Sequence, residues 1–272
     1  MAETTTTILE VNKLRKEFGG VMAVHDVSFS VARGEVFAVI GPNGAGKTTL
    51  FNLLSGALPA TAGEARFKHH VITGLRPHQI AALGLTRTFQ NVQIFGNMTV
   101  LENVMVGRHT KSRYGFIDAA LHLPRANAAE RQTRNDAMQR LEWVGLAARA
   151  HDNAGALPFG QQRVLEVARA LALDPELILL DEPGAGLTRS EVEELDQLIQ
   201  QLRGNGITVI LVEHNMELVM GIADRVMVLD YGQKIAEGTP LQVQQDERVI
   251  AAYLGVETFT AIPADANHVA AQ

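Results

Sequence analysis

The residues GPNGAGKTT at positions 41–49 constrain this chain more than any other stretch. They fit the phosphate-binding pattern G-x-x-x-x-G-K-[ST], and they lie between an apolar run at 36–40 and a helix-like stretch at 48–55, as the pattern requires. Glycines let the backbone turn tightly and bring several N–H groups to one anion, and the following helix directs its N-terminal dipole at the same place. A purely structural glycine turn is the alternative.

This loop predicts a nucleoside triphosphate site. Lys47 can reach the β- and γ-phosphates, and the Thr48 hydroxyl is placed to bind Mg²⁺. The loop residues that we expect to contact the nucleotide are Gly41, Asn43, Gly44, Gly46, Lys47, Thr48 and Thr49.

Composition narrows the classes of protein that carry such a loop. Hydrophobic residues make up 46% of the chain, enough for a sizeable core, and a net charge of −6 without a block of Lys and Arg argues against nucleic acid as a partner. Because cysteine is absent and the nine histidines lack metal-ligand spacing, we expect no metal held by protein ligands alone. Without a signal peptide or a long apolar run, the expected protein is soluble and not exported by that route.

Apolar runs alternate with helical patterns along most of the chain. This order predicts an α/β fold, with a parallel sheet that helices cover on both faces. Short strands are expected at 8–11 and 27–31, and an amphipathic helix at 162–172.

The alternation stops in the middle of the chain. Residues 91–161 indicate a helical subdomain inserted into a core of about 8–90 and 162–255. The ends at 1–7 and 256–272 show no periodic pattern, so we expect flexible tails there.

Charged residues follow two of the predicted buried strands. Asp181 and Glu182 come directly after an apolar run at 177–180, and His214 follows the next such run. Because ligands bind at the carboxyl ends of parallel strands, Asp181 is a candidate for contact with Mg²⁺, either directly or through one of the ion's own ligands. Glu182 can orient or deprotonate the water that attacks the γ-phosphate. An ordinary turn is the alternative for the pair, and a lone histidine is more often a surface or core residue.

Phe18 stands beside two glycines upstream of the phosphate loop. Such an aromatic side chain either fills the core at a strand end or stacks on a purine ring. The spacing alone leaves both interpretations open.

Five separated motifs occur in the order and spacing of an ABC transporter ATPase subunit, and the chain resembles that family over nearly its whole length. The motifs are residues 41–48, Gln90, residues 157–163, residues 177–183 and His214. The resemblance implies a P-loop NTPase of RecA-like fold with an antiparallel β subdomain and an inserted helical subdomain. It also implies a head-to-tail dimer, in which ATP lies between the phosphate loop of one subunit and residues 157–163 of the other.

The resemblance also implies roles for single residues. Phe18 stacks on adenine, and Gln90 senses both Mg²⁺ and the membrane partner. Glu182 is the catalytic base, and His214 contacts the γ-phosphate.

Several shorter stretches of the sequence are similar to the larger ATPase of high-affinity branched-chain amino acid importers. The stretches that carry this similarity are RTFQ at 87–90, FGQQR at 159–163, EHNM at 213–216 and VIAAYLG at 249–255. In that family two non-identical ATPases serve two permease subunits and a periplasmic or lipid-anchored binding protein, and they lie at the cytoplasmic face of the inner membrane. The ATPase of a lipid or lipopolysaccharide exporter and a non-transport ABC ATPase are the alternatives.

Two sites depart from the family's usual sequence. Pro158 and Phe159 replace the Ser-Gly of the signature Leu-Ser-Gly-Gly-Gln, so a hydroxyl and an N–H are missing there. Gly160 and the start of a helix near Gln161 can still offer backbone donors to the partner's phosphate. Thr188 stands where the family usually has Asp.

Overall fold

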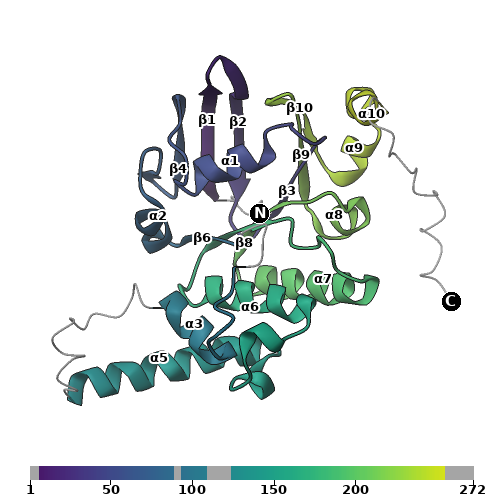
Figure 1. Ribbon diagram of the computed structural model, residues 1–272. Helices are drawn as coiled ribbons and strands as arrows, with labels where there is room; N and C mark the ends of the chain where they lie inside the picture. Colours follow the sequence, from purple (N-terminus) through teal and green to yellow (C-terminus); the bar gives the residue numbers. More distant parts are fainter. Residues whose placement is uncertain (1–5, 89–92, 109–123, 255–272) are drawn as a thin grey trace, which may run out of the picture.

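The computed structural model describes residues 6–88, 93–108 and 124–254, and its strands form two sheets (Figure 1). The central sheet has the spatial order β10 (Gln233–Gly238), β9 (Arg225–Asp230), β3 (Val36–Ile40), β8 (Thr208–Val212), β7 (Leu177–Asp181) and β6 (Leu85–Arg87). Neighbouring strands are parallel except β10, which pairs antiparallel with β9. Strands β3, β7 and β8 are buried throughout, and this double burial explains their continuous apolar sequences.

The second sheet is antiparallel. Its strands are, in spatial order, β2 (Val21–Ala32), β1 (Thr7–Phe18), β4 (Ala62–Phe67) and β5 (His70–Val71). The strands predicted at 8–11 and 27–31 exist, but both are longer than predicted. The register of β1 against β2 shifts between Val11 and Leu14, where Lys13 has a φ of 46°, and such irregularities interrupt the apolar alternation on which the prediction rested. Because β1 begins at Thr7, the last residue of the predicted N-terminal tail belongs to a strand.

Helices surround the central sheet. Those described are α1 (Lys47–Leu54), α2 (Pro77–Leu83), α3 (Val100–Arg108), α5 (Pro124–Trp143), α6 (Phe159–Leu171), α7 (Arg189–Gly204), α8 (Met216–Ile222), α9 (Pro240–Gln244) and α10 (Glu247–Leu254), with short 3-10 turns at Ala147–Arg149 and Ala154–Ala156. Within the described ranges, no helix is both long and apolar enough to cross a membrane.

Two hydrophobic cores lie on opposite faces of the central sheet. Alternate residues of β3 show this division, because Phe37 and Val39 belong to the core shared with α1 and the antiparallel sheet. Val36 and Ala38 belong to the core shared with α6, α7 and α8. The sheet is therefore fixed from both sides, and this rigidity fixes the positions of its strand ends.

A third core forms the helical part, which lies below the sheets in Figure 1. Helices α3, α5 and α6 pack there through residues such as Val104, Leu141 and Leu165. Helix α6 begins at Phe159, not at 162 as predicted, because Pro158 precedes it as the N-cap, where a missing N–H breaks no helical hydrogen bond. Helix α6 extends across residue 161, where the helical subdomain was predicted to end. The limits of the core and of the helical subdomain stay a prediction. The predicted fold class, with a parallel central sheet, an antiparallel β subdomain and a helical subdomain, is confirmed.

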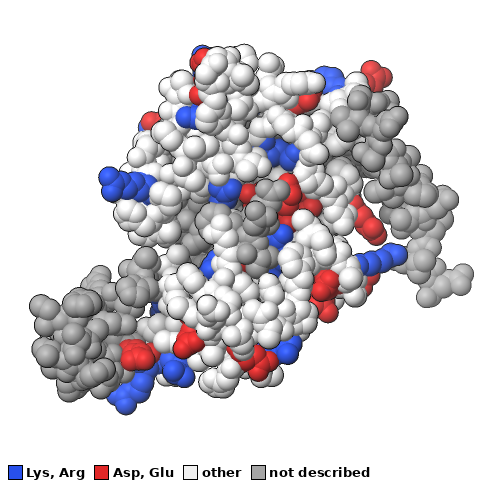
Figure 2. Space-filling view, viewed as in Figure 1, with Lys and Arg blue, Asp and Glu red and all other residues white. Residues whose placement is uncertain are grey.

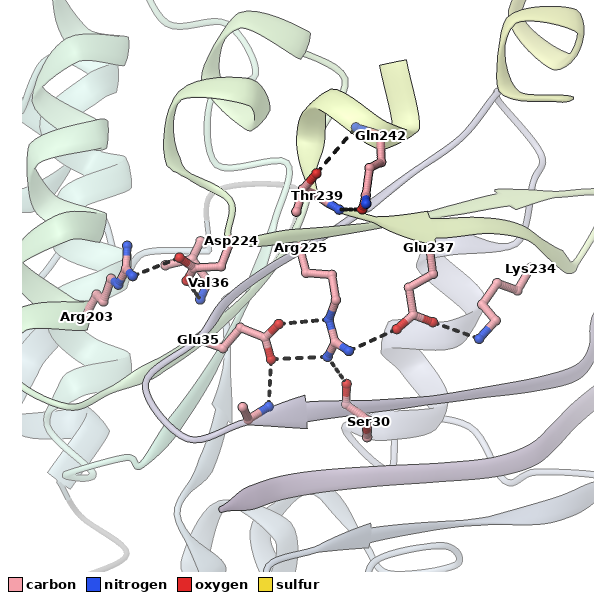
Figure 3. A network of polar contacts seen from close by, with 11 residues as sticks. Ser30, Glu35, Val36, Arg203, Asp224, Arg225, Lys234, Glu237, Thr239 and Gln242 are labelled. Atoms are coloured by element: carbon pink, nitrogen blue, oxygen red, sulfur yellow. Dashed lines mark hydrogen bonds and ion pairs between the residues drawn. The ribbon is translucent and has the colours of Figure 1, made fainter. Parts of the chain in front are cut away.

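A network of charged side chains joins the two sheets at the starts of the central strands (Figure 3). Arg225, the first residue of β9, contacts both carboxylate oxygens of Glu35 at 2.9 and 3.2 Å and one oxygen of Glu237 at 3.1 Å. It also donates to the backbone carbonyl of Ser30 in β2. The other oxygen of Glu237 accepts from Lys234 Nζ at 2.7 Å. Each of these carboxylate oxygens therefore has a partner.

Candidate active site

The phosphate loop, residues 41–46, joins β3 to α1, and its shape depends on glycine. Gly41 has a φ of 148°, and a Cβ there would lie 2.0 Å from the backbone oxygen of Leu229. Gly46 has a φ of 99°, and a Cβ there would lie 2.3 Å from the backbone oxygen of Ala23. The loop is thus pressed against both sheets at positions where other residues do not fit.

The outer side of the loop is open to solvent. Asn43, Gly44 and Thr48 are exposed, and Thr49 is half-buried. Backbone N–H groups and the start of α1 therefore stand where an anion can approach them, as the sequence predicts.

Lys47 lies inside the loop. Its side chain is buried, and Nζ donates to the carbonyls of Gly41 at 2.7 Å and Pro42 at 2.9 Å. Burial lowers the pKa of Lys47, while the nearby carboxylates of Glu182 and Asp181 act against that shift. A lysine ammonium has three N–H bonds, so it can also donate to a phosphate held by the loop.

Asp181 is the last residue of β7 and is almost completely buried. Its Oδ2 accepts from Arg87 Nη2 at 2.7 Å, whereas its Oδ1 has no hydrogen-bond partner among the described residues. A buried oxygen of this kind suits a cation, and Mg²⁺ prefers oxygen ligands.

Mg²⁺ in a nucleotide site needs few protein ligands. In the described part of the chain no three His, Cys, Asp or Glu side chains are grouped so that they could hold a metal ion. Mg²⁺ in nucleotide sites usually takes only one or two protein ligands, together with phosphate and water oxygens. Asp181 and Thr48 supply such a pair of residues. Gln90, the third predicted metal residue, lies outside the described residues.

Glu182 and His214 form a hydrogen-bonded pair at the ends of neighbouring strands. Glu182 Oε1 lies 2.8 Å from His214 Nε2, and the backbone N–H of Glu182 donates to the carbonyl of Val212 at 2.9 Å. Glu182 has a φ of 48°, a left-handed conformation that is uncommon for glutamate, so it follows the strand without continuing it. A half-buried carboxylate held by an imidazole can accept a proton from water.

Glu213 is a residue that the sequence reasoning did not single out. It is buried, and its carboxylate accepts three backbone N–H bonds, from Gly184 at 2.6 Å, His214 at 2.9 Å and Asn215 at 3.2 Å. These bonds join the loop that follows Glu182 to the residue that carries the imidazole. An acidic residue directly after a buried strand was the only signal in the sequence, since buried charges need partners.

The segment that departs from the family's signature begins α6. Phe159 is 45% exposed, and Gln161 Oε1 accepts from Arg149 Nη1 at 2.8 Å. The carboxylate of Glu191, in the first turn of α7, lies against Gly160, because a Cβ on Gly160 would lie 2.3 Å from it. The predicted phosphate donor Gly160 is therefore packed against a carboxylate of its own chain.

The departure at Thr188 also has a structural reason. Thr188 is the N-cap of α7, and its Oγ1 accepts from the N–H of Glu191 at 3.4 Å while Glu191 Oε2 accepts from the N–H of Thr188 at 2.8 Å. Threonine and aspartate both serve as N-caps, so this substitution keeps the start of the helix.

Phe18 lies at the end of β1 and is 45% exposed, so the interpretation as a core residue is wrong. Lys16 Nζ lies 4.8 Å from the centre of its ring. An exposed ring is available for stacking, and contact with adenine stays a prediction. Figure 2 shows basic and acidic side chains close together near the middle of the face in view.

Comparisons with known proteins agree with this geometry. Residues 24–185 match the family described as ABC transporter, and residues 233–258 match the family described as branched-chain amino acid ATP-binding cassette transporter. The chain is 43% identical over 249 residues to the high-affinity branched-chain amino acid transport ATP-binding protein LivG of Salmonella typhimurium. It is 44% identical over 249 residues to the protein of the same description, BraF, of Pseudomonas aeruginosa. Both alignments cover 91% of this chain and 98% of the relative.

A solved structure gives the same result for the fold. An ATP-binding cassette of an ABC transporter, in its ADP conformation, matches with a TM-score of 0.82 and 33% identity. The match covers 92% of this chain and 100% of the other.

Proposed function

Because the chain belongs to the family of ABC transporter ATP-binding subunits, as its motifs predicted, we propose that it hydrolyses ATP to power the import of branched-chain amino acids. The chain is an ATPase of the ABC type. The substrate class rests on one observation, the 43% and 44% identity, over 91% of the chain, to two proteins described as branched-chain amino acid transport ATP-binding proteins. The match of residues 233–258 to a family of the same description supports it.

The chemistry follows from the residues at the strand ends. The loop amides and Lys47 bind the phosphates of ATP. Glu182 accepts a proton from the water that attacks the γ-phosphate, and a positioned base of this kind contributes about 10²–10⁴-fold in rate. His214 Nε2 lies 2.8 Å from the Glu182 carboxylate, and its ring is exposed, so its N–H can turn from Glu182 to the γ-phosphate when ATP is bound.

Mg²⁺ bound with ATP neutralises charge on the β- and γ-phosphates. We assign its protein contacts to Thr48 and Asp181, with Gln90 as a third. The support for Asp181 is its buried Oδ1, which lacks a hydrogen-bond partner in the described ranges. Thr48 is exposed in the first turn of α1, beside Lys47.

A second, non-identical ATPase subunit completes the site in this proposal. Pro158 and Phe159, at the start of α6, are exposed and can face the nucleotide of the partner subunit. Because the Glu191 carboxylate packs against Gly160, the partner's γ-phosphate has to approach the Gly160 N–H beside a negative charge. ATP contacts both subunits only when the dimer is closed, and this differential binding shifts the equilibrium toward closure.

The permease partner, in our proposal, docks in an apolar groove of about 750 Å³ between the core and the helical part. Its apolar wall includes Ala57, Pro77, Ala81, Ile94, Phe95 and Val106. Phe95 is 46% exposed and Val106 is 38% exposed, so two large apolar side chains of this wall are open to solvent. A groove with spaced apolar side chains suits a helix of the permease. With the permease bound there, the subunit in our proposal lies at the cytoplasmic face of the inner membrane, opposite a periplasmic or lipid-anchored binding protein.

Uptake of labelled leucine tests this function. In cells that lack the gene but keep the permease and binding protein, the wild-type chain should restore uptake of leucine and not of arginine. Lys47→Ala should abolish it, because the loop loses its cation for the phosphates. Wild-type ATPase activity without leucine uptake would contradict the substrate class, and a purified protein without ATPase activity would contradict the whole proposal.

A matched pair of variants tests the role of the groove in the same uptake assay. Val106→Glu places a charge in the groove, whereas Val71→Glu places one on β5 at a valine that is 40% exposed. Val106→Glu should lose uptake and co-purification with the permease while the purified subunit still hydrolyses ATP. Val71→Glu should behave like the wild type. Equal uptake in both variants would place the permease elsewhere.

A further inference from the structure

Arg87 is buried between three elements, at the end of β6. Its side chain is only 8% exposed. Nη2 donates to Asp181 Oδ2 at 2.7 Å, and Nη1 donates to Asn52 Oδ1 at 2.6 Å and to Ser55 Oγ at 3.0 Å. The planar guanidinium thus binds the end of β7 with one nitrogen, and Asn52 of α1 and its C-cap residue Ser55 with the other.

Arg87 binds the helix that directly follows the phosphate loop. Helix α1 runs from Lys47 to Leu54, so Thr48 lies in its first turn while Asn52 lies one turn further on. Asp181 ends the neighbouring strand β7. Arg87 therefore joins the two elements that supply Thr48 and Asp181.

Stability alone does not account for this arrangement. Removing two charges from water is costly, and the mutual attraction repays that cost only when the remaining polar atoms are also paired. Here Asp181 Oδ1 stays without a hydrogen-bond partner among the residues described. The arginine fixes one oxygen of the carboxylate and leaves the other for a ligand.

We propose that Arg87 is a positioning residue for magnesium. It holds Asp181 through Oδ2 so that Oδ1 faces the ion, and through Asn52 and Ser55 it sets the spacing between Asp181 and Thr48. This inference rests on the proposed function, because it needs a nucleotide bound at the phosphate loop. Arg87 also belongs to the wall of the groove assigned to the permease, so a helix seated there lies against the residue that holds the magnesium contact.

Nucleotide binding measured by calorimetry tests the proposal without relying on turnover. A non-hydrolysable ATP analogue is titrated first in EDTA and then over a series of Mg²⁺ concentrations. Arg87→Met should bind the analogue in EDTA as the wild type does. The Mg²⁺ concentration needed for half of the gain in affinity should rise about tenfold, since loss of a group that orients a metal ligand typically weakens metal binding by 10–100-fold.

The direction of this change separates positioning from charge. Removing a positive charge beside Asp181 would, by electrostatics alone, strengthen the binding of a cation. Weaker Mg²⁺ binding in Arg87→Met therefore supports positioning, whereas unchanged or stronger Mg²⁺ binding overturns it. An equal loss of affinity in EDTA and in Mg²⁺ also overturns it, because that result indicates a general defect of the loop.

A second variant covers the case in which Arg87→Met does not fold. Arg87→Lys keeps the charge but has a single nitrogen, which cannot bind Asp181 and α1 in the same fork geometry, so its Mg²⁺ requirement should also rise. Arg225→Lys, in the network of Figure 3, is the matched control and should leave the Mg²⁺ requirement unchanged. A wild-type chain that binds no nucleotide with Mg²⁺ would instead contradict the proposed function.

Discussion

Two arginines lie at opposite edges of the central sheet, one at the edge where the parallel strands begin and the other at the edge where they end. Their surroundings differ in one respect. Arg225 stands at the start of β9, where both oxygens of Glu35 and of Glu237 have partners (Figure 3). Arg87 stands at the end of β6, where Asp181 is bound through one oxygen only. In the described residues the second oxygen, Oδ1, has no hydrogen-bond partner.

This difference separates a structural network from a site. At the strand starts, each carboxylate oxygen of the network is satisfied by the chain itself, and the network joins the two sheets. At the strand ends, burial and an unsatisfied oxygen occur together, and that combination is costly unless a ligand completes it. Substitutions at the two edges should therefore affect different quantities, stability at one and chemistry at the other.

The largest effect is expected from matched substitutions of one carboxylate at each edge. Glu182→Gln removes the base but keeps the shape of the side chain, so turnover should fall by about 10²–10⁴-fold while ATP still binds and the melting temperature stays the same. Glu35→Gln should leave turnover per folded molecule unchanged and lower the melting temperature, because an amide cannot replace both oxygens that Arg225 binds.

Steady-state ATPase assays and thermal denaturation of both proteins check this pair. The comparison between the edges breaks down if Glu182→Gln keeps wild-type turnover, or if Glu35→Gln loses turnover without any change in stability. An ATP-bound dimer trapped by Glu182→Gln would further support a catalytic role for the carboxylate at the strand ends, because hydrolysis is the step that reopens the dimer in our proposal.

A smaller effect is expected from removing the arginine at the strand starts. Arg225→Met leaves Glu35 and Glu237 without their common partner, at positions that are 11% and 19% exposed. Breaking a buried pair costs 3–5 kcal/mol, and with this partial exposure we expect a loss of about 2 kcal/mol in the free energy of unfolding. Urea denaturation measures it. A stability equal to that of the wild type would show that the network does not hold the sheets together.

The parts of the site that the sequence predicts are those that lie close together along the chain. The glycines around Lys47 and the pair Asp181 and Glu182 are local patterns, because backbone turns and strand ends depend on neighbouring residues. In the structure the carboxylates of Glu182 and Asp181 lie near enough to Lys47 to act against the burial that lowers its pKa. Parallel strands bring their carboxyl ends to one edge of a sheet, and this rule made the prediction possible.

The contacts that the sequence does not predict join distant residues. Arg87 and Asp181 are 94 positions apart, and nothing in either motif tells which oxygen the arginine takes. The contact between Gly160 and Glu191 likewise depends on how α6 packs beside α7. Single-sequence patterns report periodicity and turn chemistry, whereas side-chain pairing depends on tertiary packing. The bulges of β1 were missed for a related reason, because they break the period itself.

The smallest effect is expected at Glu213, which lies at the same edge as the site but does not touch a substrate. Its carboxylate accepts the N–H groups of Gly184, His214 and Asn215. In Glu213→Gln an NH₂ group replaces one oxygen and faces at least one of these donors. The loop after Glu182 and the backbone of His214 should then move apart, and kcat should fall by about tenfold, since misplacement by 1 Å can cost up to 10²-fold. KM for ATP should stay the same.

Two further measurements separate positioning from loss of structure at Glu213. Glu217→Gln, four residues further on and exposed, is the matched control and should change neither kcat nor the melting temperature. If Glu213 acts through the imidazole, Glu213→Gln should cause little further loss in a His214→Ala background, because residues of one network are not additive. If the effects of Glu213→Gln and His214→Ala on kcat are fully additive, or if Glu213→Gln lowers the melting temperature with unchanged kcat, then Glu213 has a structural role, like that of Arg225.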